Sequence, residues 1–429
     1  MKYQTDRAFA EKMDAADALR SFRAQFHIPK MKDDRDTIYL CGNSLGLQPR
    51  TTQPAILQEL KDWQELGVEG HFRAKNPWWP YHESVTKQTA ALVGARPSEV
   101  VVMNSLTVNL HLMMVSFYRP TPERFKIIIE TPVFPSDLYA VESQLRFHGH
   151  DPAGALIKLK PRKGEDTLRT EDIEDVIAKK GKQVALVLIG GVNYYTGQYF
   201  DIARITKAAH AVGATAGFDL AHAAGNVAMK LHDWDVDFAC WCSYKYLNAG
   251  PGSLAAVFVH ERHGKNFELP RFCGWWGHDP KTRLKGIDFD PAAGAEGWQL
   301  SNPPILSLAA VKASLDIFAG AGIDRLREKS IKLTGYLEFL LDSLDTDAFR
   351  IMTPRAPDAR GCQLSLTVRE NGKAVHAQLE KAGVVCDWRD PDCIRVAPVP
   401  LYNSFADVHE FTRLFAAALG LKDKLREAV

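Results

Sequence analysis

The segments TAGFDLAH (residues 215–222) and FACWCSYKYLN (residues 238–248) each begin with an apolar run. Uninterrupted apolar runs of this length are typical of strands that are buried on both faces of a sheet. Asp219 ends the first run, and Lys245 stands three positions after the second. The two charged side chains are therefore predicted to lie at the carboxyl ends of neighbouring strands.

Further apolar runs lie on both sides of these segments and alternate with helical patterns such as Ile202–Val212. Alternation of strands and helices indicates an α/β fold, in which a mostly parallel sheet is covered by helices. Ligands of such sheets bind at the carboxyl ends of the strands. The predicted strands are Val100–Met103, Lys126–Glu130, Val184–Gly190, Thr215–Asp219, Phe238–Cys242 and Ala255–Val259.

The chain has 429 residues, and a single core rarely grows past about 250–300 residues. Two domains are therefore expected. A long helical region, Ser307–Leu344, leads into a smaller α+β pattern, and the first helices have no sheet of their own. We predict a large domain over residues 66–306 and a small domain formed by residues 1–65 and 307–429. The expected elements after this region are strands Gln363–Thr367, Val384–Asp387 and Ile394–Ala397 and helices Ala374–Ala382 and Phe405–Leu419.

The composition excludes several classes of protein. Hydrophobic residues make up 46% of the chain and the net charge is +1, which argues against disorder and against a nucleic-acid-binding surface. Residues 5–26 lack the apolar segment of a signal peptide, and no apolar run reaches the length of a membrane span, so a cytoplasmic protein without membrane contact is expected. Seven scattered cysteines argue against a disulfide framework. Cys240 and Cys242 lie in a predicted buried strand without a second ligand pair, so no metal site is predicted.

Lys245 and Asp219 together suggest a particular cofactor. A lysine amine at a strand end, partly removed from water, is able to form a Schiff base with an aldehyde. A carboxylate on the neighbouring strand end is able to hold a protonated pyridine nitrogen, and His222 could then stack on the ring or bind its phenolic oxygen. Taken singly, Lys245 reads as a surface lysine and Asp219 as a loop or cap residue. The pair predicts pyridoxal 5′-phosphate.

Two more segments fit that cofactor. Residues 104–109 lie between a strand and a helical pattern, where unpaired amides and the Thr107 hydroxyl are available to a phosphate. Phe134 follows the strand Lys126–Glu130 and is placed to stack on a flat ring. The alternatives are an ordinary helix cap and a proline-rich turn with Phe134 as core filling.

At this point a series of blocks resembles one family, kynureninase, in the right order from about residue 38 to 415. No single block is specific, but the ordered series is. The blocks are Cys41–Pro49, Asn104–Leu110, Phe134–Asp137, Tyr195–Gln198, Phe218–His222, Ser243–Gly250, Ser301–Pro304 and Arg395–Asn403.

The resemblance implies a homodimer of the aspartate-aminotransferase fold (fold type I of the pyridoxal-phosphate enzymes), with a small domain built from both chain ends. It implies an enzyme that cleaves L-kynurenine, and often 3-hydroxykynurenine, into an anthranilate and L-alanine, in tryptophan catabolism or NAD biosynthesis. Catalysis would rest on Lys245, Tyr244 and Asp219, with Tyr244 as a candidate proton donor. The cofactor-binding residues that the resemblance implies are Leu106, Thr107, Phe134, Asp137, Asp219, His222, Tyr244, Lys245, Trp275 and Asn302.

The resemblance also implies substrate-binding residues. Arg395 would clamp the substrate α-carboxylate, which a planar guanidinium binds through two parallel hydrogen bonds. His71 would lie near the aromatic ring of the substrate, and Ser44 and Asn302 complete the set. Trp275 and Asn302 match positions that the partner subunit supplies.

One position departs from the family pattern, and two questions stay open. Gly190 stands where the family often has Ser or Thr, which puts one hydrogen bond to the cofactor in doubt. Another enzyme of the same fold, a cysteine desulfurase-like lyase or an aminotransferase, is the alternative function. The sequence does not rank kynurenine against 3-hydroxykynurenine, because ring selectivity depends on contacts near His71, Trp79, His278 and Asn302.

Overall fold

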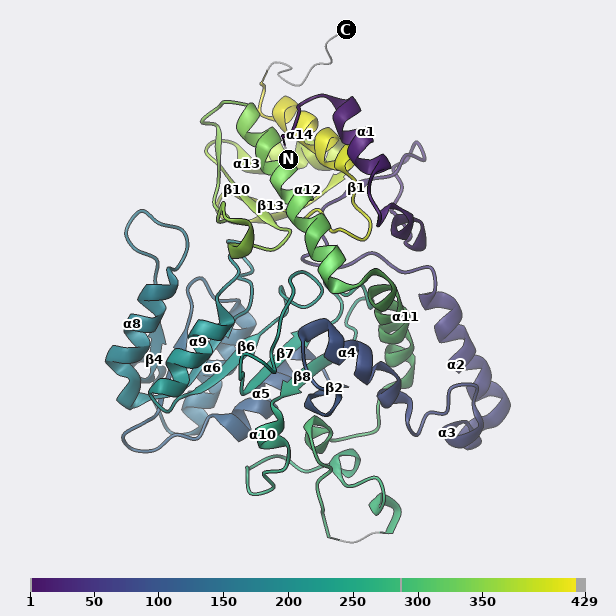
Figure 1. The fold of residues 1–429 in the computed structure, drawn as a ribbon, viewed down its shortest axis with the longest axis vertical. Helices are drawn as coiled ribbons and strands as arrows, with labels where there is room; N and C mark the ends of the chain where they lie inside the picture. The colour runs from purple at the N-terminus through teal and green to yellow at the C-terminus, as the bar shows by residue number, and fades with distance from the viewer. Residues whose placement is uncertain (1, 286–287, 422–429) are drawn as a thin grey trace.

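A computed structural model describes residues 2–285 and 288–421, and a seven-stranded sheet lies at the centre of its larger half (Figure 1). The strand order is β2-β8-β7-β6-β5-β3-β4. Strands β7, β6, β5, β3 and β4 run parallel, and β8 runs antiparallel to both of its neighbours. The strands are β2 (Val100–Met103), β3 (Lys126–Ile129), β4 (Leu156–Lys158), β5 (Val184–Gly190), β6 (Thr215–Asp219), β7 (Phe238–Cys242) and β8 (Ala255–Val259). The predicted α/β class with a mostly parallel sheet is confirmed.

Every apolar run predicted as a strand in this half forms one, and β3 ends one residue earlier than expected. The residues of β6 to β8 are buried almost without exception, because helices cover both faces of the sheet. Only β4 was not predicted. It has three residues, one of them exposed, at the edge of the sheet, and so lacks an apolar run.

Helices cover the two faces of this sheet separately. Alternate strand residues belong to two different hydrophobic clusters, because successive side chains of a strand point to opposite faces. One cluster packs against α5 (Leu106–Phe117) and α6 (Pro135–Phe147). The other packs against helices that include α4 (Thr86–Val93), α8 (Thr170–Lys180), α9 (Ile202–Ala211) and α11 (Ile305–Ala321).

The smaller half has a core of its own around a four-stranded antiparallel sheet with the order β12-β13-β10-β9. Helix α1 (Arg7–Ala15) packs on α14, and β1 (Ile38–Tyr39) pairs with β11, so the beginning of the chain joins its last part. The elements of this half from the last part of the chain are α12 (Ile323–Ser343), β9 (Phe349–Ile351), β10 (Leu364–Val368), α13 (Gly372–Lys381), β11 (Val384–Val385), β12 (Asp387–Arg389), β13 (Cys393–Val396) and α14 (Phe405–Ala418). Of these, β9 was not predicted, and the single strand predicted at Val384–Asp387 is in fact two strands: β11, which pairs with β1, and β12, which pairs with β13.

The long helical region after Ser307 is two helices, α11 and α12, which meet at Gly322. Gly322 has φ of 79°, a backbone conformation that few residues other than glycine adopt, and the helices are bent by 77° there. Helix α11 packs on α2 (Thr52–Leu66) and belongs to the cluster of the large sheet, whereas α12 belongs to the small core. The division of the chain into two domains at residues 66 and 307 stays a prediction. Residues 286–287 and 422–429 of the predicted domains lie outside the described residues. We propose that α2 and α11 belong to the large domain and that the small domain resumes at Gly322.

Among the described residues no single helix is both long and apolar enough to cross a membrane, and α11 with α12 meets that test only as a bent pair. The seven cysteines are all free, and Cys240 and Cys242 are buried in β7 as predicted.

Candidate active site

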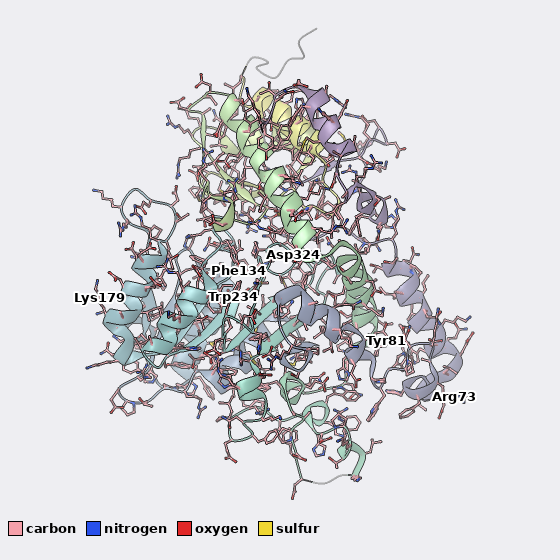
Figure 2. All side chains as sticks on the ribbon, viewed as in Figure 1. Arg73, Tyr81, Phe134, Lys179, Trp234 and Asp324 are labelled. Carbon is pink, nitrogen blue, oxygen red and sulfur yellow. The ribbon has the colours of Figure 1, made fainter. Side chains whose placement is uncertain are left out.

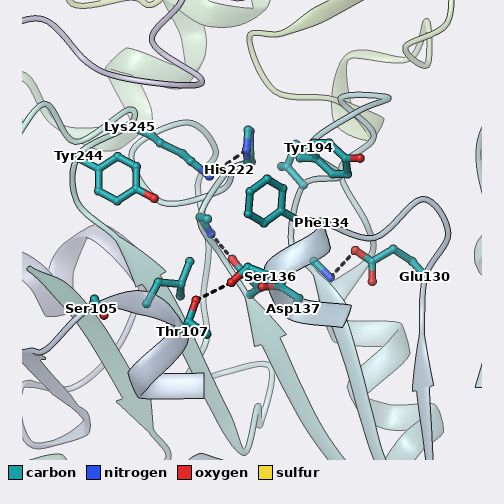
Figure 3. A pocket seen from close by; sticks show the side chains of 15 residues that line it. Ser105, Thr107, Glu130, Phe134, Ser136, Asp137, Tyr194, His222, Tyr244 and Lys245 are labelled. Carbon is teal, nitrogen blue, oxygen red and sulfur yellow. Dashed lines mark hydrogen bonds between the residues drawn. The ribbon is translucent and has the colours of Figure 1, made fainter. Parts of the chain in front are cut away.

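A cavity of about 730 Å³, counted with its open mouth, lies at the carboxyl ends of β3, β5 and β6 (Figure 3). Figure 2 shows Phe134, which lines it, near the centre of the molecule, whereas Arg73 and Lys179 lie at opposite edges. Besides strand ends, the first turns of α5 and α6 contribute to its wall. Its lining residues are Ser105, Leu106, Thr107, Glu130, Phe134, Ser136, Asp137, Gly190, Val192, Tyr194, Asp219, Ala221, His222, Tyr244 and Lys245.

Lys245 is buried in this cavity, and its Nζ lies 3.1 Å from Nε2 of His222. The same amine lies 5.4 Å from the ring centroid of Phe134. Burial, followed by the charge of Lys245, holds the pKa of His222 well below its usual range. His222 is therefore neutral and accepts a hydrogen bond from Lys245, while its buried Nδ1 has no partner among the described residues.

Two carboxyl groups, Asp219 and Asp137, face each other beside Lys245. Burial raises the pKa of Asp137, and the neighbouring charge of Asp219 raises it further. Burial also raises the pKa of Asp219, but the ammonium group of Lys245 and a hydrogen bond from the Ala221 amide, at 2.6 Å, oppose that rise. Asp137 therefore keeps its proton and donates a hydrogen bond to Asp219, so that the pair carries one negative charge toward the cavity.

Another part of the cavity wall offers hydrogen-bond donors to an anion. Helix α5 begins at Leu106, and the side chain of Ser105, which precedes it, makes no capping hydrogen bond. The first amides of this helix and its dipole therefore remain available to a negative group. The hydroxyls of Thr107 and Ser136 lie 2.8 Å apart at the same place.

These walls fit the functional groups of pyridoxal 5′-phosphate. Lys245 suits its aldehyde, Asp219 its pyridine nitrogen, and the Leu106–Thr107 turn its phosphate. Buried polar atoms rarely stay unpaired. Oδ1 of Asp137 and Nδ1 of His222 are both buried without a partner among the described residues, as expected of a site built for a polar ligand.

Arg395 is not among the residues that line this cavity. It is 1% exposed, and its Nη1 donates to the carbonyl oxygen of Tyr194 at 2.5 Å. Its Nη2 forms an ion pair with Asp387. The ring of Tyr194 lines the cavity and packs edge-on against Phe134, with 5.4 Å between centroids. Ser44 lies just beyond Cys41, which bridges to Ala397 beside the strand of Arg395.

The other predicted site residues lie away from this cavity. Trp275 is 47% exposed, and it packs edge-on against Trp79 at 5.9 Å between centroids. Asn302 is exposed. His71 belongs to the short helix α3 (Gly70–Arg73), at the edge of the molecule where Figure 2 shows Arg73. One chain therefore brings together Lys245, Asp219 and the other cofactor candidates, but not these three.

Sequence reasoning assigned no role to Glu130, Tyr194 and Asp387. Glu130 carried the same signal as Asp219, an acid directly after an apolar strand, and it lines the same cavity. Tyr194 stands one position before a block that was recognised. Asp387 stands outside the recognised blocks, and only the structure brings it to Arg395.

The fold is shared with solved structures of low sequence identity. A mutant of C-DES with glycine covalently linked to its PLP cofactor aligns with a TM-score of 0.76 at 17% identity, covering 92% of this chain and 98% of that one. The cysteine desulfurase CsdA of Escherichia coli aligns with a TM-score of 0.73 at 18% identity, covering 94% and 98%. The expected fold, fold type I of the pyridoxal-phosphate enzymes, is confirmed.

Sequence comparison identifies the family. The model of the kynureninase C-terminal domain matches residues 326–415. A kynureninase of Koribacter versatilis is 60% identical over 418 residues, which cover 97% of this chain and 99% of that protein. A kynureninase of Myxococcus xanthus is 60% identical over 412 residues, covering 96% and 97%. With such identity over nearly the whole of each chain, and a cavity that fits pyridoxal phosphate, the protein belongs to the kynureninase family.

Proposed function

We propose that this protein is a pyridoxal-phosphate-dependent hydrolase that converts L-kynurenine to anthranilate and L-alanine, with 3-hydroxykynurenine as a possible second substrate. The observation that carries the proposal is that Lys245 and Asp219 face one buried cavity. The membership of the family supports the choice of substrate. The reaction would serve tryptophan catabolism or NAD biosynthesis in the cytoplasm.

The residues of the cavity divide the binding of the cofactor among them. The amine of Lys245 would hold the aldehyde, Asp219 with Asp137 the pyridine nitrogen, and Leu106 and Thr107 the phosphate. Phe134 would stack on the ring. When bound, pyridoxal phosphate supplies an electron sink that allows bonds at the substrate α-carbon to ionise.

Proton transfer falls to Lys245 and Tyr244. With a substrate bound, the amine of Lys245 would be placed to take the α-proton, and His222, whose pKa is lowered by burial and by the charge of Lys245, is too weak a base to compete for it. Burial raises the pKa of Tyr244, so its hydroxyl keeps its proton at neutral pH. Hydrolysis needs water at the ketone carbon and a proton at the β-carbon, and Tyr244 is the proposed donor of that proton.

Arg395 and Ser44 are proposed to bind the α-carboxylate of the substrate. The guanidinium of Arg395 is held by Tyr194 and Asp387, and its Nε is buried without a partner among the described residues. A carboxylate would satisfy such a donor and would be oriented by it. That orientation fixes which bond at the α-carbon breaks.

A homodimer is proposed to complete the site. Trp275, His71 and Asn302 lie away from the cavity of their own chain, and Phe72 and Trp275 leave 61% and 47% of their surfaces exposed. Exposed aromatic groups of this size are typical of interaction surfaces.

Two experiments test the homodimer. Light scattering should give a molar mass of twice the chain mass. Mixing Lys245→Ala and Trp275→Ala chains should restore activity, because one site of the mixed dimer then has both residues. If activity is not restored, the result would argue against a site shared by the two subunits.

The decisive experiment follows anthranilate fluorescence and alanine release from L-kynurenine. The protein should carry a visible cofactor absorbance band, and Lys245→Ala should lose both this band and turnover. Unchanged turnover of that variant would refute the proposal. A wild-type protein without the band would refute it as well.

The alternative, a cysteine desulfurase-like activity, finds support in the structural neighbours but not in the cysteines of this chain. Cys362 and Cys393 are both fully buried, and burial raises the pKa of each thiol to about 12. A nucleophilic cysteine needs an accessible thiolate. Release of sulfide from L-cysteine would nevertheless revive this alternative.

The ratio of the kcat/KM values for kynurenine and 3-hydroxykynurenine would rank the two substrates.

A further inference from the structure

Glu130 is a buried carboxylic acid of the cavity to which none of the roles above is assigned. It directly follows β3, is 5% exposed, and lines the same cavity as Asp219 and Tyr194 (Figure 3). Its Oε1 accepts a hydrogen bond from the Gly190 amide at 3.1 Å. Because β5 lies between β3 and β6, Glu130 and Asp219 flank the strand that ends at Gly190. Burying an acid is costly unless it has a partner, so its place in a ligand cavity calls for an explanation.

Gly190 leaves the space that Glu130 occupies. A Cβ atom at position 190 would lie 2.9 Å from Oε1 of Glu130, closer than such contacts normally are. Gly190 is not among the glycines with positive φ. Its backbone conformation therefore does not require glycine, but a side chain at this position would have to displace the carboxyl group of Glu130. The carboxyl group of Glu130 thus lies beside the place that a side chain at position 190 would take. Position 190 itself is paired with Asp219 in the sheet.

The carboxyl group of Glu130 titrates near neutral pH instead of in the acid range, so a large share of it is protonated at pH 7. Burial raises its pKa to about 7, hydrogen bonds from backbone amides oppose the rise, and Asp219 adds to it. Asp137 on α6 and Tyr194 after β5 also face it, and Lys245 and His222 share the cavity. A protonated carboxyl is both a donor and an acceptor. It is therefore able to donate to an anionic oxygen of a ligand without adding charge to the Asp219–Asp137 pair.

We propose that Glu130 is a further cofactor-binding residue, whose carboxyl group donates a hydrogen bond to the phenolic oxygen of pyridoxal phosphate from the place that a side chain at position 190 would otherwise occupy. This inference rests on the proposed function, because it needs that cofactor. It also gives a reason for the glycine at position 190, which leaves room for this carboxyl group. The donor is lost as the pH rises through the pKa of Glu130, so the cofactor is held less tightly above neutral pH.

The first test measures release of the cofactor from the holoenzyme by dialysis, followed through its visible absorbance. Glu130→Ala should raise the dissociation constant roughly tenfold or more, because a hydrogen bond to a charged group is lost. Glu130→Gln keeps a donor that does not titrate. It should bind the cofactor about as tightly as the wild type, but without the change in affinity between about pH 6 and 8.

The second test asks whether positions 130 and 190 substitute for each other. Gly190→Ser alone should weaken cofactor binding, because its Cβ crowds Glu130. The same change together with Glu130→Ala should recover much of the lost affinity, because the serine hydroxyl then takes over the hydrogen bond. Additive losses in the double variant would overturn the inference.

The outcomes separate this inference from the proposed function. A wild-type protein without a visible band would refute the function itself. A normal wild-type band, with Glu130→Ala and Glu130→Gln releasing the cofactor like the wild type at every pH, would refute only the role of Glu130. If Glu130→Ala does not fold, Glu130→Gln and its pH profile decide the matter alone.

Discussion

At the scale of single residues, Arg395, the proposed carboxylate-binding residue, is held in place by two groups of its own chain. Asp387 forms ion pairs with both Arg395 and Arg389, and the Arg395 side chain is 1% exposed while that of Arg389 is 38% exposed. The carbonyl of Tyr194 fixes a second edge of the Arg395 guanidinium. A guanidinium held at two points has little orientation left to lose when it binds a carboxylate.

We therefore predict that Asp387→Asn raises the KM for L-kynurenine roughly tenfold, the effect of one weakened hydrogen bond to a charged group, while kcat changes little. Steady-state kinetics on the purified holoenzyme measures both constants. Arg389→Gln is the matched control, because it removes the exposed partner of the same carboxylate and should raise KM much less. A lower KM for Asp387→Asn would show that Asp387 competes with the substrate instead of orienting Arg395.

The sequence was sufficient to predict several residues that meet in the cavity, but not all of their neighbours. Lys245 and Asp219 stood out because charged residues directly after apolar strands are unusual. Glu130 gave the same signal and was interpreted only as the end of a strand. Asp387 could not be identified, because its partner Arg395 lies on the adjacent antiparallel strand and the register that aligns them is a property of the folded sheet.

At the scale of elements, Asp237, which directly precedes β7, joins β6, α9 and α10. Its Oδ2 accepts hydrogen bonds from the Ala216 amide of β6 at 2.7 Å and from His210 of α9 at 2.8 Å. Its Oδ1 accepts one from His263 of α10 (Glu261–Gly264) at 2.8 Å and pairs with Arg262. Burial alone would raise the pKa of Asp237, but these partners hold that pKa well below its usual range.

A depressed pKa in the folded state means that Asp237 contributes stability above its unfolded-state pKa, about 4, and that this contribution falls away as the pH drops toward the folded value. We predict that Asp237→Asn destabilises the protein by roughly 3 kcal/mol at pH 7, because its partners lose the negative charge of a buried carboxylate. The deficit against the wild type should narrow below about pH 4. Thermal unfolding at several pH values measures both effects.

Asp235→Asn is the control for this prediction. Asp235 also pairs with Arg262, but its side chain is 60% exposed, and exposed ion pairs contribute about 0–1 kcal/mol. It should therefore lower the melting temperature little. Equal losses of stability in the two variants would contradict the role assigned to Asp237. So would a stability deficit of Asp237→Asn that grows as the pH falls.

Elements with long periodic or apolar patterns were predictable, and very short ones were not. Strands β5 to β8 are continuous apolar runs and were predicted at their observed bounds. Strands β4 and β9 have three residues each, too few for a pattern, and they exist because a neighbouring strand pairs with them. The break between α11 and α12 was missed because the apolar pattern continues through Gly322, while the packing partner changes.

At the scale of the whole molecule, the loop 193–197 after β5 connects the two halves. Its carbonyl groups at Tyr194, Tyr195 and Thr196 all accept hydrogen bonds from the smaller half. The Asn193 side chain holds the loop in shape and donates to the carbonyl of Pro132, next to the turn that carries Phe134. The loop therefore links the wall of the cofactor cavity to the strand of Arg395.

This long-range arrangement was beyond sequence reasoning. The loop was recognised only as part of the block Tyr195–Gln198, and nothing in it shows which half of the molecule it contacts. The positions of Trp275 and Asn302 were equally open, because residues proposed to act across a dimer carry no local sign of it.

Thr353 tests whether this link matters for function. Its hydroxyl donates to the Thr196 carbonyl at 2.6 Å and accepts from the Ser365 amide at 2.8 Å, and Ser365 is paired with Arg395 in the sheet. Thr353→Val keeps the shape but leaves two buried groups unpaired, which costs about 1–3 kcal/mol for each. We predict a lower melting temperature together with a KM for L-kynurenine raised several-fold. Thr353→Ser keeps the hydroxyl and should behave like the wild type. If Thr353→Val lowers the melting temperature but leaves KM unchanged, the loop stabilises the junction of the two halves without positioning Arg395.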